Sequence, residues 1–277
     1  MKTKRYTTII ATTLALTGLC FAEDAKPSEV KKDTGIDAAA MKSAQESFNL
    51  PTPGEMLRAA DGKIDMKKLT AALGETPQIA PDASDAMGAH LLGICLADGF
   101  VSLYAKDAAH VKANGKVLLE IAEQLGADEQ VTAEGKKIGT LVTNENWADA
   151  FTSADTFRTH LLQSLVHDGD KDLATIASAS GWLRGFGLAA GEIAQSYQGE
   201  TSRLLRQPEL ATHLAERVRK LPAGVITDSA KAADSLQQIA TLCTVKQDAD
   251  ISKESVEKIT AAAKEGLSAL EGTPNKK

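Results

Sequence analysis

Residues 87–104 read MGAHLLGICLADGFVSLY, and residues 176–194 read IASASGWLRGFGLAAGEIA. Each stretch has the length of a helix of about five turns and is apolar on nearly every side of that helix. Such helices lie in the centre of a protein, because a helix at the surface keeps one polar face toward water. We therefore predict an all-α fold in which these two apolar helices are central and the other helices surround them.

The two stretches resemble each other when the second is shifted by 88 positions. Gly93 then coincides with Gly181, and Gly99 coincides with Gly187. Two interpretations stay open: a faint internal duplication of helical hairpins, or a chance match between two helices rich in glycine and alanine. Because a glycine inside a helix costs about 1 kcal/mol relative to alanine, the glycines also predict that the two helices approach each other closely.

Apolar residues recur at every third or fourth position along the remainder of the chain, and alternating strand patterns are missing. We predict a single all-α domain over residues 36–271, built as a bundle of roughly ten helices. Within it, the pattern indicates a short helix at residues 147–151 and a separate helix that Ser153 caps. Residues 23–35 and 272–277 are charged or polar, and we predict a flexible leader and a flexible tail there.

The chain begins with the pattern of a secretory signal peptide. Three cations within the first five residues are followed by an uncharged, mostly apolar run and then by Cys20-Phe21-Ala22, in which small residues occupy the −3 and −1 positions of a cleavage site. We predict that residues 1–22 are removed after export, which leaves the protein periplasmic or secreted. A retained membrane anchor is disfavoured by the short apolar run, and lipidation of Cys20 is disfavoured by the bulky Leu19 before it.

Composition limits the partners of the mature chain. Residues 1–22 contain three of the 31 basic and none of the 37 acidic residues, so the mature chain has 28 basic and 37 acidic residues and a net charge of −9. Nucleic acid is therefore not an expected partner, since it requires a basic surface, and aromatic side chains for base stacking are only 4% of the sequence. No later stretch combines enough length with enough freedom from charge to span a membrane, so we predict a soluble mature protein without a transmembrane segment.

No motif for metal binding, cofactor binding or nucleophilic catalysis is complete. Residues 61–65, DGKID, resemble the second half of a calcium-binding EF-hand loop, but Leu57 and Ala59 stand where carboxylates are needed, and Lys68 replaces the closing glutamate. We predict a turn and a helix cap there, and no metal. The chain also lacks the serine motifs of hydrolases and a glycine loop for phosphate, and we predict no cofactor.

Two cysteines, Cys95 and Cys243, remain after cleavage of the signal peptide. An oxidising compartment and an even number of cysteines permit a disulfide between them. The alternative is a pair of separate buried thiols, since a free cysteine is commonly a core residue. The sequence leaves both alternatives open.

Each apolar stretch contains a charge that stands alone. Asp98 is the lone charge of residues 91–101, and Arg184 is the lone charge of residues 176–190. A buried charge without a partner is very costly, so we predict an ion pair between Asp98 and Arg184 in the core. The alternative is that helix rotation brings either side chain to the surface, as the long arginine side chain allows.

One segment of this acidic chain is basic. Five cations lie within residues 203–220 against two acids, Glu209 and Glu216, which gives a local charge of +3. The five cations are Arg203, Arg206, Arg217, Arg219 and Lys220. Arginine matches carboxylate and phosphate groups, so we predict a partner surface here for an acidic envelope protein or an anionic envelope polymer. The alternative is structural, because cations near a helix C-terminus stabilise the helix dipole.

We predict an exported, soluble helical protein that acts as a non-enzymatic binding or scaffold protein of the cell envelope. This prediction rests on the incomplete catalytic motifs. The alternative is an envelope hydrolase with a carboxylate pair that no sequence motif reveals. A cleft lined by carboxylates, with one acid of raised pKa, would favour the hydrolase, whereas an exposed apolar or charged patch would favour the binding protein.

Overall fold

The computed structural model describes most of the chain after residue 59. The described residues are 60, 62–167, 170–246 and 248–273. They all belong to one unit, residues 34–277. The predicted signal peptide, the predicted leader and the first part of the predicted domain lie outside the described residues, as do residues 274–277.

Regular secondary structure in the described ranges is helical, which confirms the predicted all-α bundle of roughly ten helices. The first helices are α3 (Met66–Ala71), α4 (Asp85–Tyr104), α5 (Ala108–Gln124), α6 (Glu129–Thr143) and α7 (Trp147–His167). They are followed by α8 (Lys171–Gln195), α9 (Gly199–Ser202), a 3-10 turn at Arg203–Leu205, α10 (Pro208–Val218), α11 (Ser229–Cys243) and α12 (Lys253–Ala269).

Many of these helices begin at a side chain that accepts a hydrogen bond from the first turn. A serine or aspartate oxygen before the helix satisfies backbone N–H groups that have no partner inside the helix. The capping residues are Asp65, Ser84, Asp107, Asp128, Asp228 and Ser252. Asp65 accepts from the N–H groups of Lys67 and Lys68, so the DGKID segment supplies the helix cap that the sequence predicts.

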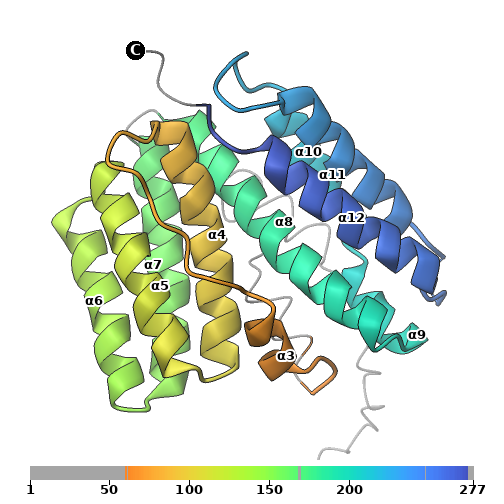
Figure 1. Ribbon diagram of the computed structural model, residues 1–277, viewed down its shortest axis with the longest axis horizontal. Helices are drawn as coiled ribbons and strands as arrows, with labels where there is room; N and C mark the ends of the chain where they lie inside the picture. Colours follow the sequence, from red (N-terminus) through yellow and green to blue (C-terminus); the bar gives the residue numbers. More distant parts are fainter. Residues whose placement is uncertain (1–59, 61, 168–169, 247, 274–277) are drawn as a thin grey trace, which may run out of the picture. The chain divides into compact units, whose positions relative to one another are not determined.

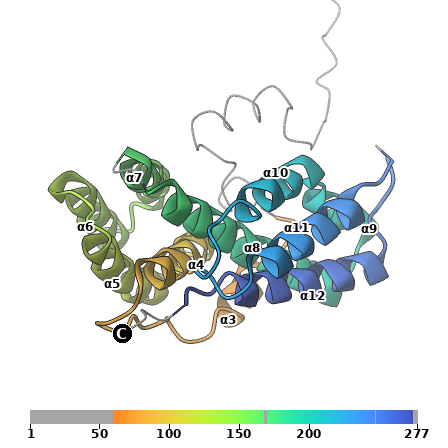
Figure 2. The ribbon, with the colours of Figure 1, turned by 90° about the horizontal axis from the view of Figure 1, so that it is seen from above.

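Helices α4 and α8 lie side by side in the centre of this unit (Figure 1). Helices α5, α6 and α7 pack on one side of the pair, and α10, α11 and α12 pack on the other side, as both views show (Figures 1 and 2). Helix α4 is apolar along its length, whereas α8 is apolar in its middle and exposes Lys171, Asp172 and Gln195 at its ends. The bundle is therefore built around α4 and α8, of which α4 is the more uniformly apolar.

The length and apolar character of α4 correct one prediction. Among the described residues, α4 is the helix that is long and apolar enough to cross a membrane, with a mean hydropathy of 1.5, although the sequence analysis excluded any such stretch after the signal peptide. In the folded protein, 78% of its apolar window is buried by the other helices. A core helix passes the same test as a membrane span, and α4 fills the position of a core helix.

The two central helices cross at Gly93 and Gly181. A Cβ atom on Gly93 would overlap the carbonyl oxygen of Ala177, and a Cβ atom on Gly181 would lie 2.9 Å from the carbonyl oxygen of Gly93. Real Cβ contacts are not this short, so the backbones approach as closely as they do only because both residues are glycine. The close contact predicted from the helical glycines is therefore present.

The second matched pair, Gly99 and Gly187, faces outward from the crossing. A Cβ atom on Gly99 would lie 3.2 Å from Nδ2 of Asn114 in α5, and one on Gly187 would lie 3.0 Å from Cβ of Ala263 in α12. Each of these two glycines thus contacts one neighbouring helix, α5 for Gly99 and α12 for Gly187. However, α5 directly follows α4 in the chain, whereas α12 is the last helix after α8, so the two halves do not repeat one order of packing.

Helix α7 is continuous over Trp147–His167, and the predicted break before Ser153 is wrong. The reason is the apolar face, which runs without interruption across this point through Ala150, Ala154, Phe157 and Leu161, all of them buried. The packing of this face against the bundle outweighs the preference of Ser153 for a capping position.

The first two residues of the predicted tail belong to the described part of the chain. Gly272 forms an isolated antiparallel bridge with Ile226, and the N–H of Thr273 donates to the carbonyl oxygen of Val225 at 3.2 Å. A Cβ atom on Gly272 would overlap the backbone of Met87 in α4. The first two residues of the predicted flexible tail are therefore held against the loop before α11 and the first turn of α4.

Candidate functional site

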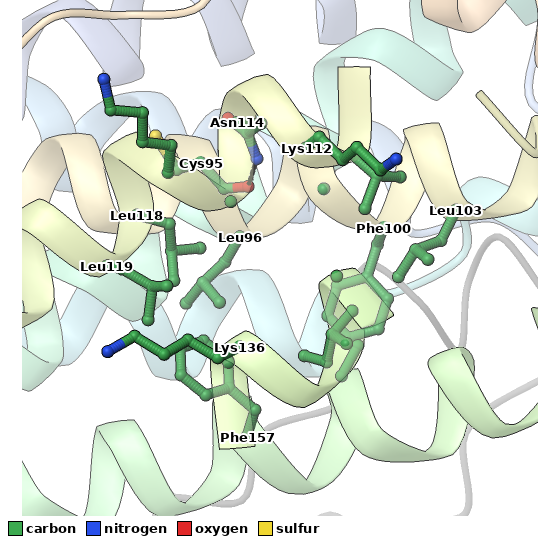
Figure 3. A pocket seen from close by; sticks show the side chains of 18 residues that line it. Cys95, Leu96, Phe100, Leu103, Lys112, Asn114, Leu118, Leu119, Lys136 and Phe157 are labelled. Carbon is green, nitrogen blue, oxygen red and sulfur yellow. Dashed lines mark hydrogen bonds between the residues drawn. The ribbon is translucent and has the colours of Figure 1, made fainter. Parts of the chain in front are cut away.

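A pocket of about 300 Å³ lies between α4, α5, α6 and α7. Its wall is mostly hydrocarbon, and Figure 3 shows the larger apolar side chains around it. These side chains are Leu96, Phe100, Leu103, Leu118, Leu119 and Phe157. A space of this size is at the lower end of the range for small-molecule pockets, about 300–1,000 Å³.

The pocket exists because α5 and α6 are in tight contact at one point and separate at another. A Cβ atom on Gly135 of α6 would lie 2.6 Å from Cδ2 of Leu119 and 3.1 Å from Cε2 of Phe157, so this glycine permits close packing. Gly115 of α5 and Gly139 of α6 also line the pocket, but a Cβ atom on either would meet nothing within 4 Å. No side chain of the described residues packs on these two helical glycines, and they leave space open at the pocket wall.

Asn114 supplies a buried polar group to the pocket. Its side chain is 5% exposed, and its Nδ2 donates to the backbone carbonyl oxygen of Cys95, in the space that Gly99 leaves free. Its Oδ1 atom has no hydrogen-bond partner among the described residues. An unsatisfied buried acceptor costs about 1–3 kcal/mol, and this oxygen is enclosed by the protein rather than open to the pocket.

The charged side chains at the pocket are lysines. Lys112 and Lys116 come from α5 and Lys136 comes from α6; all three are exposed, and Figure 3 shows Lys112 and Lys136 on opposite sides of the pocket. Lys116 has a solvated partner in Glu120, at 3.8 Å between Nζ and Oε1. Within the described part of the chain, Lys112 and Lys136 form no ion pair, and no aspartate or glutamate lines the pocket. The opening is therefore positively charged in an acidic protein.

Cys95 lies at the pocket, and Cys243 lies at the end of α11 in the other half of the bundle. Both thiols are free and buried, so of the two alternatives that the sequence leaves open, the structure supports two separate core thiols and not a disulfide. Helix α4 packs against α5 and α8, whereas α11 packs between α10 and α12, which places the two cysteines in different layers. Burial raises the pKa of each thiol to about 12, so neither is a thiolate nucleophile at neutral pH.

The lone charges of the two central helices meet each other. Arg184 donates from Nε to Oδ1 of Asp98 at 2.7 Å and from Nη2 to Oδ2 at 3.0 Å, and Nη2 also donates to the carbonyl oxygen of Leu73 at 2.6 Å. The Asp98 side chain is 7% exposed. Burial raises the pKa of the Asp98 carboxyl, and the guanidinium of Arg184 opposes this shift. The pair ties α4, α8 and the end of α3 together.

A second and more open hollow, of about 560 Å³, lies between α3, α8 and α12. Three of its four charged side chains form ion pairs: Lys68 lies 3.5 Å from Glu192, and Arg184 is bound by Asp98. Glu192 also accepts from the hydroxyl of Ser196 at 3.2 Å. The fourth, Lys264, is exposed to solvent.

The first arginines of the basic segment bind the loop before α12. Arg203 donates from Nε to Oδ1 of Asp250 at 2.7 Å, which raises the pKa of the Arg203 guanidinium. Arg206 donates from Nη2 to the carbonyl oxygen of Ala249 at 2.6 Å. These contacts hold residues 249–250 against the turn after α9.

The remaining cations of the segment lie in the last turn of α10 and directly after it. Arg217 is partly buried and donates to Oγ1 of Thr175 at 2.8 Å, and burial lowers the pKa of its guanidinium to about 10. Arg219 contacts Asp234 at 2.6 Å, with both side chains largely exposed, and Lys220 is exposed. The four arginines thus have contacts inside the chain, and a partner surface on this segment stays a prediction.

Among the residues that the structure describes, no group of three or more His, Cys, Asp and Glu side chains could hold a metal ion. Comparisons of the chain with protein-family models, with curated proteins and with solved structures found no match. The interpretation of the pocket therefore rests on its own geometry and charge.

The pocket was not predicted from the sequence, although a local signal was present. Asn114 and Gly115 lie between two lysines spaced four residues apart, Lys112 and Lys116, in the middle of an amphipathic helix. A buried asparagine and a glycine at such a place weaken a helix unless the tertiary structure uses them. These residues line a pocket with α6 and α7 only because of the spacing between the helices. Hydrophobic periodicity does not predict that spacing.

Proposed function

We propose that the protein is a non-enzymatic binding protein that holds a small, largely apolar molecule in the pocket between α4, α5, α6 and α7. The observation that carries this proposal is the open apolar space beside Gly115 and Gly139, two helical glycines on which none of the residues described by the structure packs. Protein interiors are close-packed, and an apolar cavity of this size that stays dry takes up apolar molecules. Leucine and phenylalanine side chains with one inward polar group are the usual lining of a ligand pocket.

The ionisable groups at the pocket favour binding over hydrolysis. The lining residues include three lysines and the protonated thiol of Cys95, but no carboxylate. Glycoside hydrolysis by a carboxylate pair requires two acids facing one cleft. Asp98, the buried acid whose pKa is raised, is held by both nitrogens of the Arg184 fork and faces no second carboxylate in that interaction.

The cell envelope remains the proposed location, and the signal-peptide pattern of residues 1–22 supports it. A water-filled compartment between membranes limits the movement of poorly soluble molecules. A helical protein with one apolar pocket would hold such a molecule in solution, as storage or during transfer to another envelope component.

The test uses N-phenyl-1-naphthylamine, an uncharged dye whose fluorescence rises in apolar surroundings. We expect the purified protein to bind the dye saturably, with one site per chain. The double variant Gly115→Leu/Gly139→Leu should bind at least about tenfold more weakly, which corresponds to about 1.4 kcal/mol, because its side chains fill the open wall. Its thermal midpoint should be unchanged or higher, since leucine is a better helix former than glycine.

The matched control is Gly191→Ala in α8. Its Cβ atom would make an ordinary contact, 3.7 Å from Cγ2 of Thr260, and Gly191 lies outside the pocket. This variant should bind the dye as the unmodified protein does. Equal binding by the double leucine variant and the unmodified protein would contradict the proposed function.

A further inference from the structure

The second hollow, between α3, α8 and α12, has the features of a binding site that is separate from the apolar pocket. We infer that it binds an uncharged saccharide of disaccharide size. The inference rests on two largely buried charged side chains that each keep a free polar atom, on their counter-ions within the chain, and on an apolar floor that a glycine leaves open.

One face of α8 forms the long wall of this hollow. Its lining residues recur at three- and four-residue spacing, so they share one side of the helix. Arg184 and Glu192 are eight residues apart, and their Cα atoms therefore lie about 12 Å apart along the helix axis. Gly187, Leu188 and Gly191 lie between them. The hollow thus has a charged side chain at each end of an apolar stretch.

At one end, Arg184 keeps a pair of N–H groups for a ligand. Its Nε and Nη2 atoms donate to Asp98 and to the Leu73 carbonyl oxygen, whereas Nη1 has no hydrogen-bond partner among the described residues. The side chain is 21% exposed, and Nη1 is not one of the atoms that the protein encloses. Its two N–H groups are therefore able to donate to an oxygen in the hollow.

At the other end, Glu192 keeps a carboxylate oxygen. Its Oε1 atom lies 3.5 Å from Nζ of Lys68 and accepts from the hydroxyl of Ser196, whereas Oε2 has no hydrogen-bond partner in the described part of the chain. The side chain is 8% exposed, yet Oε2 is not enclosed. A carboxylate that has lost most of its hydration favours a donor, because hydrogen bonds to ionised groups are stronger than those between neutral groups.

The charges of both side chains already have counter-ions within the chain. Asp98 is the counter-ion of Arg184, and Lys68 is the counter-ion of the acid. An ionic ligand would bring an excess charge into the hollow, whereas a hydroxyl group only completes the missing hydrogen bonds. Because a hydroxyl is both donor and acceptor, the same group satisfies Glu192 at one end and Arg184 at the other. Lys264 is exposed at the edge, where water and salt screen it.

The middle of the hollow is apolar and open. Leucines from three helices line it, namely Leu69, Leu188 and Leu267. A Cβ atom on Gly191 would make an ordinary contact, 3.7 Å from Cγ2 of Thr260. Packing therefore does not require glycine at this position, although glycine costs about 1 kcal/mol in a helix. Its effect is to leave the floor free of a side chain between the two charged ends.

This arrangement matches the two sides of a sugar ring. A pyranose ring presents C–H groups on its faces and hydroxyl groups around its edge, so its faces suit the leucine floor and its hydroxyls suit the polar ends. The separation of about 12 Å along α8 favours two joined rings, because one ring is too short to reach both ends. The volume of about 560 Å³ lies within the usual range for small-molecule pockets, about 300–1,000 Å³.

The experiment titrates the unmodified protein by isothermal titration calorimetry with three disaccharides of different shape: maltose, cellobiose and trehalose. Glucose, triglycine and inorganic phosphate are the comparison probes. We expect saturable binding of at least one disaccharide, with one site per chain. Glucose, which reaches only one end, should bind at least about tenfold more weakly, as should the zwitterion and the anion. Raising the salt concentration should leave disaccharide binding unchanged, because the ligand has no charge.

Two variants locate the site. Gly191→Leu should abolish disaccharide binding, because its side chain fills the floor, and should keep or raise the thermal midpoint, since leucine is the better helix former. Glu192→Gln keeps the shape of the side chain and removes its charge, so it should weaken binding by about tenfold. The matched control is Lys264→Gln, which should bind the disaccharide as the unmodified protein does.

The results separate this site from the apolar pocket. The variant Gly115→Leu/Gly139→Leu should bind the disaccharide normally, and Gly191→Leu should bind the uncharged dye normally. The inference is wrong if none of the three disaccharides binds saturably, or if triglycine or phosphate binds more tightly than all of them. Equal binding of glucose and the best disaccharide would overturn the size of the ligand, and unchanged binding by Gly191→Leu would overturn its location. Each of these results leaves the proposed function of the apolar pocket standing.

Discussion

Asp98 and Arg184 can each carry a charge in the core because each is the other's hydrogen-bonded partner. Two parallel hydrogen bonds join the carboxylate to the guanidinium, and the Leu73 carbonyl takes a further N–H of the same fork. The energy of such a buried pair is a small difference between desolvation and attraction, whereas removal of one partner leaves the full desolvation cost of the other.

We expect Asp98→Ala to lower the free energy of unfolding by about 3–5 kcal/mol, because Arg184 would then be left without its counter-ion in the core. The double variant Asp98→Leu/Arg184→Met should lose less, since it removes both charges and keeps apolar volume. Urea denaturation of the three proteins gives the comparison. If the double variant were less stable than Asp98→Ala, the ion pair would stabilise the fold more than apolar side chains of similar volume do, which contradicts this expectation.

A second residue makes stability depend on pH. His90 is 6% exposed, its Nδ1 lies 2.9 Å from Oγ of Ser180 across the α4–α8 contact, and burial lowers its pKa from 6.5 to about 4. The folded protein therefore takes up this proton less readily than the unfolded chain. The stability from neutral His90 is present above pH 6.5 and is lost as the pH falls toward 4.

We expect the unfolding free energy to fall by about 3 kcal/mol between pH 7 and pH 4 on account of His90 alone. Denaturation curves over this range should show the decrease in the unmodified protein and not in His90→Gln, which cannot take up the proton. The control is His110, replaced in the same way, which is partly exposed and contacts Asp107. A decrease of the same size in His90→Gln and in the unmodified protein would assign the pH dependence to other groups.

At the scale of helices, glycine has two opposite roles in this bundle. At Gly93 it permits two backbones to touch, and at Gly115 it leaves a helix wall open. The sequence pattern of both is the same, a glycine inside an amphipathic or apolar helix, and only the neighbouring helix separates the two roles.

The two roles predict opposite effects of the same substitution. Gly93→Ala should destabilise the protein by about 1–3 kcal/mol, because its methyl group would overlap the backbone carbonyl of Ala177 and force the central helices apart. Gly115→Ala should stabilise it by up to about 1 kcal/mol through helix propensity alone. Thermal unfolding measures both, and a stabilised Gly93→Ala protein would contradict the close crossing.

Helix boundaries were predicted where they depend on local chemistry. The helix cap within residues 61–65 was predicted from the sequence, because a short polar side chain before a helix satisfies its first N–H groups locally. The break before Ser153 was wrong, because a serine can cap a helix or lie within one, and the buried face of α7 decides between these.

At the scale of the whole molecule, the remaining prediction concerns export. Residues 1–22 lie outside the described part of the chain, and the small-residue pattern before Glu23 predicts cleavage at that bond. We expect protein purified from its native host to begin at Glu23. N-terminal sequencing and intact mass measure this directly; an intact residue 1 or a lipid on Cys20 would contradict it.

The sequence by itself determined the all-α class, the central place of α4 and the contact of α4 with α8. These follow from apolar periodicity, capping residues and paired glycines, which act over a few residues or identify one helix face. Only the tertiary structure decided that Cys95 and Cys243 stay apart and that Asn114 and the lysines of α5 and α6 line one apolar pocket. The physical reason is that a pocket is made by the distance between helices, and that distance is set by side chains far apart in the chain.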